Sequence, residues 1–276
     1  MKNKPTIKEL LSENRPLVMG ILNVTPDSFA DGGKYNVAGS AIAHAQEMIA
    51  EGADIIDIGA ESSRPGSDPV SEEEEFARLL PVLECLGDAR VPISVDTMKP
   101  TVAQKCLAEG ADMINDIAGL TNPDMTAVVA EAQCSVVIMH MQGEPKTMQK
   151  APHYDDVIAD IKNFFQKQIT SAKEAGITEI ILDPGIGFGK TLEHNLAIIN
   201  NLAEFSDLGY PVLLGASRKS FIEKITGEPV EKRLSATIAV NTIGFLQGAK
   251  IFRVHDVAEH VSALALAQNI NHKNNG

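Results

Sequence analysis

Short runs of apolar residues, many of them β-branched, alternate along the chain with longer stretches in which apolar positions follow a helical spacing. This alternation is typical of repeated strand–helix units built around a parallel sheet. The run SVVIM at 135–139 is apolar almost throughout, as a strand covered on both faces should be. We predict eight strands, at 16–23, 54–59, 92–96, 112–116, 135–139, 179–183, 211–215 and 251–254.

The helical stretches lie between the predicted strands. Three segments, EGADIIDIGA at 51–60, EGADMINDIAG at 109–119 and QGAKIFRVHD at 247–256, each place a helix-ending glycine shortly before a strand, which indicates a repeated unit. Eight units without a Pro- or Ser-rich linker favour a closed (β/α)8 TIM barrel over an open, doubly wound sheet. We predict a single α/β domain over 1–276, with the barrel at about 16–270. Helices are predicted near 38–51, 71–86, 99–109, 124–132, 155–175, 191–206, 233–247 and 256–269.

Composition and charge narrow the class of protein. A content of 44% hydrophobic and 22% charged residues is a globular balance. The net charge of −13 leaves no broad positive surface for a nucleic acid. No apolar run reaches the roughly 18 to 20 residues that span a bilayer, and the N-terminal sequence lacks the apolar segment of a signal peptide. We expect a cytoplasmic protein that binds neither membrane nor nucleic acid.

Some reactive or charged residues are given structural roles. Cys85, Cys106 and Cys134 fall inside apolar patterns and are expected to be small core residues rather than disulfide partners or metal ligands. The seven histidines show no H-E-x-x-H or H-x-H spacing, so a zinc site is not expected. The run EEEE at 72–75 follows Ser71 and is predicted to form the solvated first turn of a helix, where carboxylates complement the helix dipole.

Polar residues gather at or just beyond the carboxyl ends of the predicted strands. In a parallel barrel these ends converge on one face, where the active sites of this fold are built. A single polar residue there could be an ordinary loop residue, but the recurrence along the whole chain indicates a functional site. The residues are Asn23, Asp57, Asp96, Asn115, His140, Asp183, Ser217, Arg218, Lys219, Arg253 and His255.

The charges on this face indicate the kind of ligand. Basic residues on one face of an acidic molecule favour an anion, above all phosphate, and phosphate sites in this fold often follow strands seven and eight. Asp96, Asn115 and Asp183 would lie deeper and would suit a planar heterocycle with several N–H donors. Ion pairing among the same residues is the structural alternative. The basic residues are Arg64, Arg218, Lys219, Arg253 and His255.

The segment DPGIGFGKT at 183–191 ends like a phosphate-binding P-loop. Pro184, however, stands where that motif requires glycine, and the dinucleotide-binding spacing also fails. We interpret the glycines as a tight turn after the sixth strand that holds Phe188 over the mouth of the barrel, with a purely structural turn as the alternative.

Eight longer motifs follow one another along the chain: MGILNVTPDSFADGG at 19–33, GADIIDIGAESSRPG at 52–66, SVDT at 94–97, NDIAG at 115–119, MHMQGEPKTM at 139–148, LDPGIGFGK at 182–190, GASRKSF at 215–221 and FRVHD at 252–256. Together they resemble the motifs of the bacterial dihydropteroate synthases. They span nearly the whole chain and are far more specific than any single short pattern. Two conservative departures are Ala60, where the family commonly has glycine, and Ser63, where threonine is common.

The resemblance implies a transferase of folate biosynthesis. Its reaction would condense 7,8-dihydropterin-6-ylmethyl diphosphate with 4-aminobenzoate, giving 7,8-dihydropteroate and diphosphate. The resemblance also implies a homodimer and a target of sulfonamide drugs. It places the pterin ring deep in the barrel, with Asp96, Asn115, Asp183 and Lys219 at its edge and Arg253 stacked on its face, which suits a planar guanidinium.

The other two ligand groups are assigned in the same way. The resemblance implies that Mg2+ bridges Asn23 and the phosphate oxygens, and one amide suits a metal that takes few protein ligands. Ser220 opens the helix after the seventh strand, where free backbone N–H groups favour the aminobenzoate carboxylate, with a plain helix cap as the alternative. The implied diphosphate residues are Asn23, Arg64, Arg253 and His255, and the implied 4-aminobenzoate residues are Phe29, Ser63, Pro65, Phe188, Lys219 and Ser220.

The substrate chemistry favours a dissociative, SN1-like path, because a methylene cation can delocalise into the electron-rich dihydropterin. Arg64, His255 and the metal would stabilise the departing diphosphate, while Asp96 and Asp183 would offset the cation. No protein nucleophile or dedicated general base is needed. The expected catalytic set is Asn23, Arg64, Asp96, Asp183, Lys219, Arg253 and His255.

Two rival classes of function share parts of this pattern. A pterin-dependent methyltransferase barrel would have the Asp and Asn pocket but no diphosphate to bind. A non-catalytic pterin or folate carrier would need neither the metal amide nor the loops at 25–36 and 62–70, which we expect to move and to close when diphosphate binds. The methyltransferase would leave Arg64, the SRKS segment and the RVHD pair without a purpose.

Overall fold

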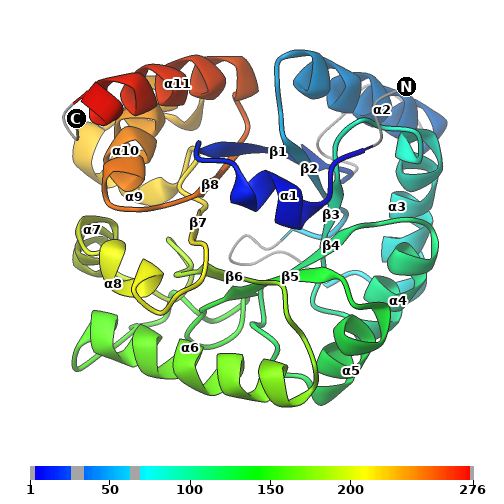
Figure 1. The fold of residues 1–276 in the computed structure, drawn as a ribbon, viewed down its shortest axis with the longest axis horizontal. Helices are drawn as coiled ribbons and strands as arrows, with labels where there is room; N and C mark the ends of the chain where they lie inside the picture. The colour runs from blue at the N-terminus through cyan, green and yellow to red at the C-terminus, as the bar shows by residue number, and fades with distance from the viewer. Residues whose placement is uncertain (1–3, 26–33, 63–68, 274–276) are drawn as a thin grey trace.

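The computed structural model describes residues 4–25, 34–62 and 69–273. Its sheet has eight parallel strands in the order β6-β5-β4-β3-β2-β1-β8-β7, and one bridge between Leu182 and Val212 joins β6 to β7. The barrel is therefore nearly closed, and Figure 1 shows the helices as a ring around it. The predicted (β/α)8 barrel is confirmed. The strands are β1 (Leu17–Asn23), β2 (Ile55–Gly59), β3 (Ile93–Asp96), β4 (Met113–Asp116), β5 (Ser135–Met139), β6 (Ile180–Asp183), β7 (Leu213–Leu214) and β8 (Ile251–Val254).

The helices follow the predicted alternation with three differences. The stretch predicted as one helix at 191–206 is two helices, a short N-terminal helix was not predicted, and the helix that Ser220 opens lies outside the predicted helix ranges. None of the described helices is long and apolar enough to span a membrane. The helices are α1 (Ile7–Ser12), α2 (Lys34–Ala50), α3 (Glu72–Leu86), α4 (Pro100–Ala108), α5 (Pro123–Ala132), α6 (Val157–Glu174), α7 (Leu192–Asn200), α8 (Ala203–Ser206), α9 (Ser220–Thr226), α10 (Leu234–Leu246) and α11 (Val257–Lys273), with a 3-10 turn η2 (Val230–Lys232).

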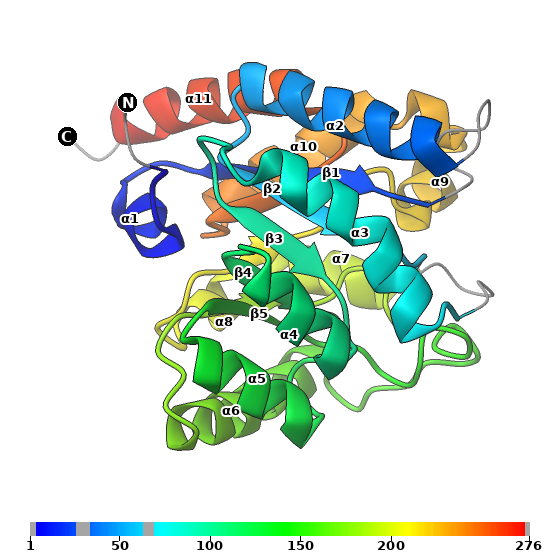
Figure 2. The ribbon, with the colours of Figure 1, turned by 90° about the vertical axis from the view of Figure 1, so that its right-hand side faces the viewer.

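Helix α1 closes the amino-terminal end of the barrel. Thr6 and Glu9 form a reciprocal capping box that holds its first turn. Its buried residues Ile7 and Leu10 pack on the inward-facing apolar residues of the strands. Figure 2 shows α1 at the end of the barrel opposite the arrowheads of β1 and β3. The carboxyl ends of the strands therefore remain as the face available for a site.

The strand period of two separates two cores. Along each strand, one side chain points outward under the helices and the next points into the barrel. The inward residues at the amino-terminal end are apolar and form a compact cluster beside α1, whereas later inward positions in several strands are polar. The cluster in the barrel contains Leu17, Met19, Ile55, Met113, Val137, Ile181, Leu213 and Ile251.

Two structural expectations need correction. Cys85 is exposed on α3, so it is not a core residue, whereas Cys106 is buried as expected; all three cysteines are free thiols. Ser71 does cap α3, but Glu75 in the predicted solvated run is 1% exposed. The burial of Glu75 is compensated by an ion pair with Lys99, the N-cap residue of the neighbouring helix α4.

Candidate active site

A layer of polar side chains crosses the barrel above the apolar cluster. Asp57 follows the inward-facing Ile55 by two residues in β2, and the same step leads from Met113 to Asn115 and from Ile181 to Asp183. Because side chains alternate along a strand, each of these polar residues shares the inward face of its apolar predecessor. Asp96 and Asn115 are register partners on β3 and β4. The predicted convergence of strand ends is thus observed.

Arg253 is the centre of this layer. Its Nε donates to Asp57 Oδ2 at 2.6 Å, and its Nη2 donates to Asp96 Oδ2 at 2.7 Å. Asn115 Nδ2 donates to the same Asp57 oxygen at 3.1 Å. Asp57 is fully buried, so the guanidinium supplies the charge that its carboxylate requires. Ion pairing, the structural alternative considered above, is therefore present at Arg253.

Two acceptors of the layer have no partner among the described residues. They are Asp57 Oδ1 and Asn115 Oδ1, and both atoms are buried. An unpaired buried acceptor is costly, so these oxygens favour a ligand or water that brings N–H or O–H donors into the barrel. Burial also raises the pKa of Asp96 to about 7, against the opposing effect of Arg253. The carboxyl of Asp96 can therefore change its charge near neutral pH.

Asp183 and Lys219 form the opposite side of the layer. Asp183 Oδ1 accepts from the Gly185 amide at 2.7 Å, and burial raises the pKa of this carboxyl. Lys219 donates to the Ile186 carbonyl, and its ammonium lies 4.5 Å from the centre of the Phe188 ring. Burial lowers the pKa of Lys219 to about 8. The predicted pair Phe188 and Lys219 is thus in contact.

The segment after β6 can approach its neighbours only because it contains glycine. Gly185, Gly187 and Gly189 all have positive φ. A Cβ at Gly185 would lie 1.9 Å from the His140 carbonyl oxygen, and one at Gly187 would lie 3.1 Å from Lys219 Cδ. The predicted tight turn is confirmed, and it brings Phe188 against Lys219.

Lys190 is a buried residue of the site that was not among the residues predicted from the sequence. This residue is 2% exposed, and its Nζ donates to His140 Nδ1 at 3.1 Å and to the Phe188 carbonyl at 2.9 Å. Burial lowers the pKa of Lys190 to about 7, and burial together with Lys190 lowers that of His140 to about 3, so His140 is a neutral acceptor. The feature of the sequence that could have identified Lys190 is its position at the end of the glycine-rich turn.

The residues that the sequence suggested for a phosphate site lie at the ends of β1, β7 and β8. Ser217 Oγ lies 2.9 Å from His255 Nδ1 and accepts from the His255 amide at 3.3 Å. Asn23 ends β1 and is partly exposed, and Ser220 is exposed at the start of α9, as predicted. Arg218 differs from the expectation, because its guanidinium pairs with Asp256.

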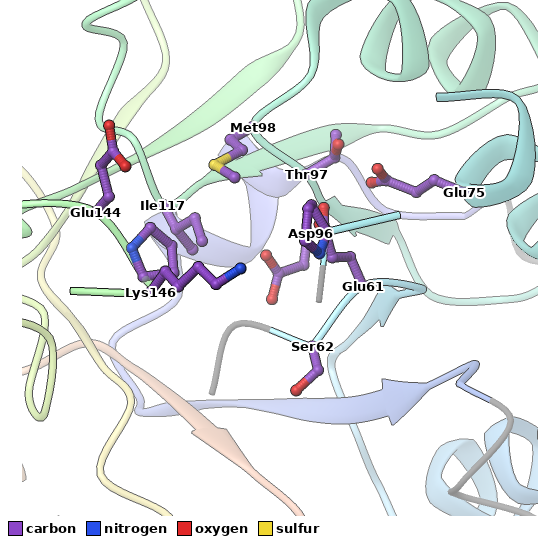
Figure 3. A pocket seen from close by; sticks show the side chains of 11 residues that line it. Glu61, Ser62, Glu75, Asp96, Thr97, Met98, Ile117, Glu144 and Lys146 are labelled. Carbon is purple, nitrogen blue, oxygen red and sulfur yellow. The ribbon is translucent and has the colours of Figure 1, made fainter. Parts of the chain in front are cut away.

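A cavity of about 200 Å3 opens beside Asp96. Figure 3 shows Glu61, Glu75 and Thr97 on one side of it and Glu144 and Lys146 on the other. Of the predicted pterin residues only Asp96 lines it. The other four bond to carboxylates or to backbone groups around the barrel axis; they are Asn115, Asp183, Lys219 and Arg253.

Some predicted site residues lie outside the described residues, namely Phe29, Ser63, Arg64 and Pro65. Within the described ranges no group of three or more His, Cys, Asp or Glu side chains is arranged to hold a metal ion. A site with a single amide ligand from the protein is compatible with that finding.

Comparisons with known proteins match this geometry. A family model described as pterin binding enzyme matches residues 19–255. Dihydropteroate synthase of Escherichia coli K12 is 48% identical over 261 residues, which cover 94% of this chain and 93% of the relative. The solved dihydropteroate synthase of Yersinia pestis, in a sulfonamide drug complex, has a TM-score of 0.89 at 46% identity and covers 95% of this chain and 96% of its own.

A further solved structure carries the product of the reaction. It is the dihydropteroate synthase of Xanthomonas albilineans in complex with 7,8-dihydropteroate, with a TM-score of 0.85, 42% identity and 94% coverage of both chains. Identity of this level over nearly the full length of the relatives shows the family. The chain belongs to the pterin-binding enzymes and, within them, to the dihydropteroate synthases.

Proposed function

We infer that this chain is a transferase that joins a 7,8-dihydropterin-6-ylmethyl group to the amine of 4-aminobenzoate and releases diphosphate. The observation that carries this conclusion is the polar layer around Arg253 in a member of a family whose solved structures include one with 7,8-dihydropteroate. The layer offers buried acceptors of the kind that the amino and ring N–H groups of a pterin require.

The pterin ring binds across the polar layer in this proposal. Asp96, Asn115, Asp183 and Lys219 bond to its edge. Arg253 stacks on its face, and because hydrogen bonds lie in the guanidinium plane, stacking leaves the bonds to Asp57 and Asp96 in place. The unpaired oxygen of Asn115 then acquires a donor from the ring.

The diphosphate binds at the ends of β1 and β8. Asn23, Arg64, Arg253 and His255 are the proposed residues, and Ser217 holds the imidazole of His255 in place. The donor set fits Mg2+ held by the amide oxygen of Asn23 and by phosphate oxygens, because Mg2+ prefers oxygen ligands and needs few from the protein. When bound, Mg2+ would neutralise charge on the leaving diphosphate.

The 4-aminobenzoate binds beside Lys219. Phe188 is proposed to face its ring and Ser220 to hold its carboxylate at the exposed first residue of α9. Phe29, Ser63 and Pro65 complete the proposed set. A sulfonamide, such as the drug in the Yersinia pestis structure, would occupy the same position.

The chain's residues support a dissociative reaction. The bond between the pterin methylene carbon and the diphosphate oxygen breaks first, and both electrons leave with the oxygen. Asp96 and Asp183 stabilise the positive charge on the pterin, while Arg64 and His255 stabilise the diphosphate. The amine nitrogen of 4-aminobenzoate then forms the new bond to the methylene carbon and loses its proton to solvent.

A homodimer is part of the same proposal. The large hydrophobic side chains that are exposed in the described ranges are confined to α7, α9, η2, α10 and α11, and α10 packs on both α7 and α11. Exposed apolar residues gathered on neighbouring elements are typical of a subunit interface. A cytoplasmic location stays a prediction from the sequence. The residues are Leu196, Ile225, Val230, Ile243, Leu246, Leu266 and Ile270.

A turnover assay tests the proposed function directly. The purified chain, mixed with the pterin diphosphate, 4-aminobenzoate and Mg2+, should release diphosphate and form 7,8-dihydropteroate. Formation of the product is measured by mass spectrometry. A carrier would bind the pterin without turnover, and a methyltransferase would form no bond to 4-aminobenzoate. Absence of product under these conditions would refute the proposal.

Replacing Arg253 by lysine should lower kcat/KM at least tenfold, equivalent to about 1.4 kcal/mol. Lysine keeps the charge but cannot bridge Asp57 and Asp96 or stack as a plane. Lys162→Arg, in a surface ion pair with Glu204 on α8, is the matched control and should retain activity. A variant Arg253→Lys with the rate of the unmodified chain would remove Arg253 from the site.

Pterin affinity should depend on the charge of Asp96. With the pKa of Asp96 at about 7, the carboxylate is lost as the pH falls, and an acceptor becomes a donor. We expect the affinity for pterin-6-carboxylate, measured by calorimetry, to fall about fivefold from pH 7 to pH 6. Asp96→Asn should abolish most of this dependence. An equal slope in both proteins would assign the titration to another group.

The dimer should depend on the exposed apolar residues of α10. Ile243→Asp and Leu246→Asp together should shift the protein from dimer to monomer in analytical ultracentrifugation, because they place charges in an apolar interface. Thr121→Asp, in a loop, serves as the control. Val128→Asp on α5 would not serve, because Val128 packs on the core. A monomeric unmodified chain at micromolar concentration would contradict the proposal.

A further inference from the structure

Lys190 lies between β6 and α7, in the wall of the site, and the proposed function gives it no role. It is 2% exposed, and its Nζ is within hydrogen-bond distance of the His140 imidazole, the His140 carbonyl and the Phe188 carbonyl. An ammonium has three N–H donors, so these three acceptors satisfy it completely. A buried lysine whose donors are all occupied holds its partners in fixed positions.

The glycine-rich turn at 185–189 encloses the amine of Lys190. A Cβ at Gly185 would lie 3.3 Å from Lys190 Nζ, so the backbone passes close to the amine at a residue with positive φ. Nζ donates to the Phe188 carbonyl at 2.9 Å and to the His140 carbonyl at 3.1 Å. The His140 amide in turn donates to the Asp183 carbonyl at 2.9 Å. Lys190 therefore links the turn to the adjoining ends of β5 and β6.

Phe188 connects Lys190 to the substrate site. Its side chain is half-buried, and its ring centre lies 4.5 Å from the ammonium of Lys219. Both Phe188 and Lys219 are proposed to bind 4-aminobenzoate. The carbonyl that accepts from Lys190 belongs to the same residue as this ring, so the bond fixes the backbone from which the ring projects. Every contact from Lys190 to Lys219 thus lies in the described part of the chain.

The pterin side of the site is held by other bonds. Arg253 is fixed by two carboxylates, and Asp183 Oδ1 accepts from the Gly185 amide at 2.7 Å. Burial lowers the pKa of Lys190 and the negative charge of Asp183 raises it, so these two groups interact through charge. We therefore expect a loss of Lys190 to affect 4-aminobenzoate more than the pterin.

We propose that Lys190 is a positioning residue for 4-aminobenzoate. It touches neither substrate. By donating to the Phe188 carbonyl from inside the turn, it holds the Phe188 ring beside Lys219, where the aminobenzoate ring binds. Without the ammonium the carbonyl would lose its partner, and the turn would shift to give it access to water. The inference rests on the proposed function, because it assigns the lysine to the binding of one of the two substrates.

The test separates the two substrates. Lys190→Met keeps an unbranched side chain of similar length and removes all three donors. KM for 4-aminobenzoate should rise at least tenfold, while kcat and the affinity for pterin-6-carboxylate, measured by calorimetry, should each stay within threefold. Lys162→Met, which removes a surface lysine of α6 paired with Glu204, is the matched control and should change none of these values.

A double-mutant cycle tests whether the effect passes through Phe188. Phe188→Ala removes the ring itself, so the position of its backbone should no longer affect 4-aminobenzoate. In that background Lys190→Met should raise KM less than twofold further. A further tenfold rise would show that Lys190 acts by another route and would overturn the inference.

A second variant decides the question if Lys190→Met does not fold. His140→Phe keeps an aromatic ring beside Phe164 and Tyr154 and removes the imidazole that contacts Lys190. It should raise KM for 4-aminobenzoate at least threefold and leave pterin affinity unchanged. An unchanged KM in the folded variants, or an equal loss of affinity for both ligands, would contradict the inference. Absence of turnover by the unmodified chain would instead refute the proposed function.

Discussion

The ion pairs of Arg253 with Asp57 and Asp96 are the constraint on which the rest of the site depends. Asp57 is fully buried in the middle of β2, where an unpaired carboxylate would not stay charged. One guanidinium from β8 neutralises it and still reaches Asp96 on β3. The pairs therefore join three strands across the barrel and leave two buried oxygens unpaired, which gives the interior a preference for a ligand rich in donors.

The second condition of the site is the close approach of backbone segments around β6. Gly185 packs against the carbonyl of His140, and the buried amine of Lys190 donates to two carbonyls and contacts one imidazole beside the turn. This arrangement presents the Ile186 carbonyl to Lys219 and the Phe188 ring to the same ammonium. Backbone geometry and buried charge together thus define the wall of the site where Phe188 lies.

Much of this architecture could be predicted from the sequence because its signals are local. The strand runs and strand-end residues such as Asn115 and Asp183 follow from periodicity, and the long motifs imply the ligand classes. What could not be predicted depends on partners distant in sequence. The run at 72–75 is uniform as a sequence, and only packing against Lys99 distinguishes Glu75 from its neighbours. Two of the three groups that Lys190 contacts likewise belong to His140, just after the end of β5.

The barrel has one weak seam. Strand β7 is only two residues long, and a single bridge from Leu182 to Val212 joins its start to β6, whereas β7 and β8 share two register pairs and the remaining neighbouring strands share three to five. A strand pair with few backbone hydrogen bonds opens at the lowest free energy. The barrel is therefore easiest to widen between β6 and β7. Asp183 is the last residue of β6, and Lys219 follows β7 as the N-cap of α9. Any expansion that admits a ring between these two side chains would therefore be absorbed by hinge-like parting of β6 and β7, while the Arg253 side of the barrel stays rigid.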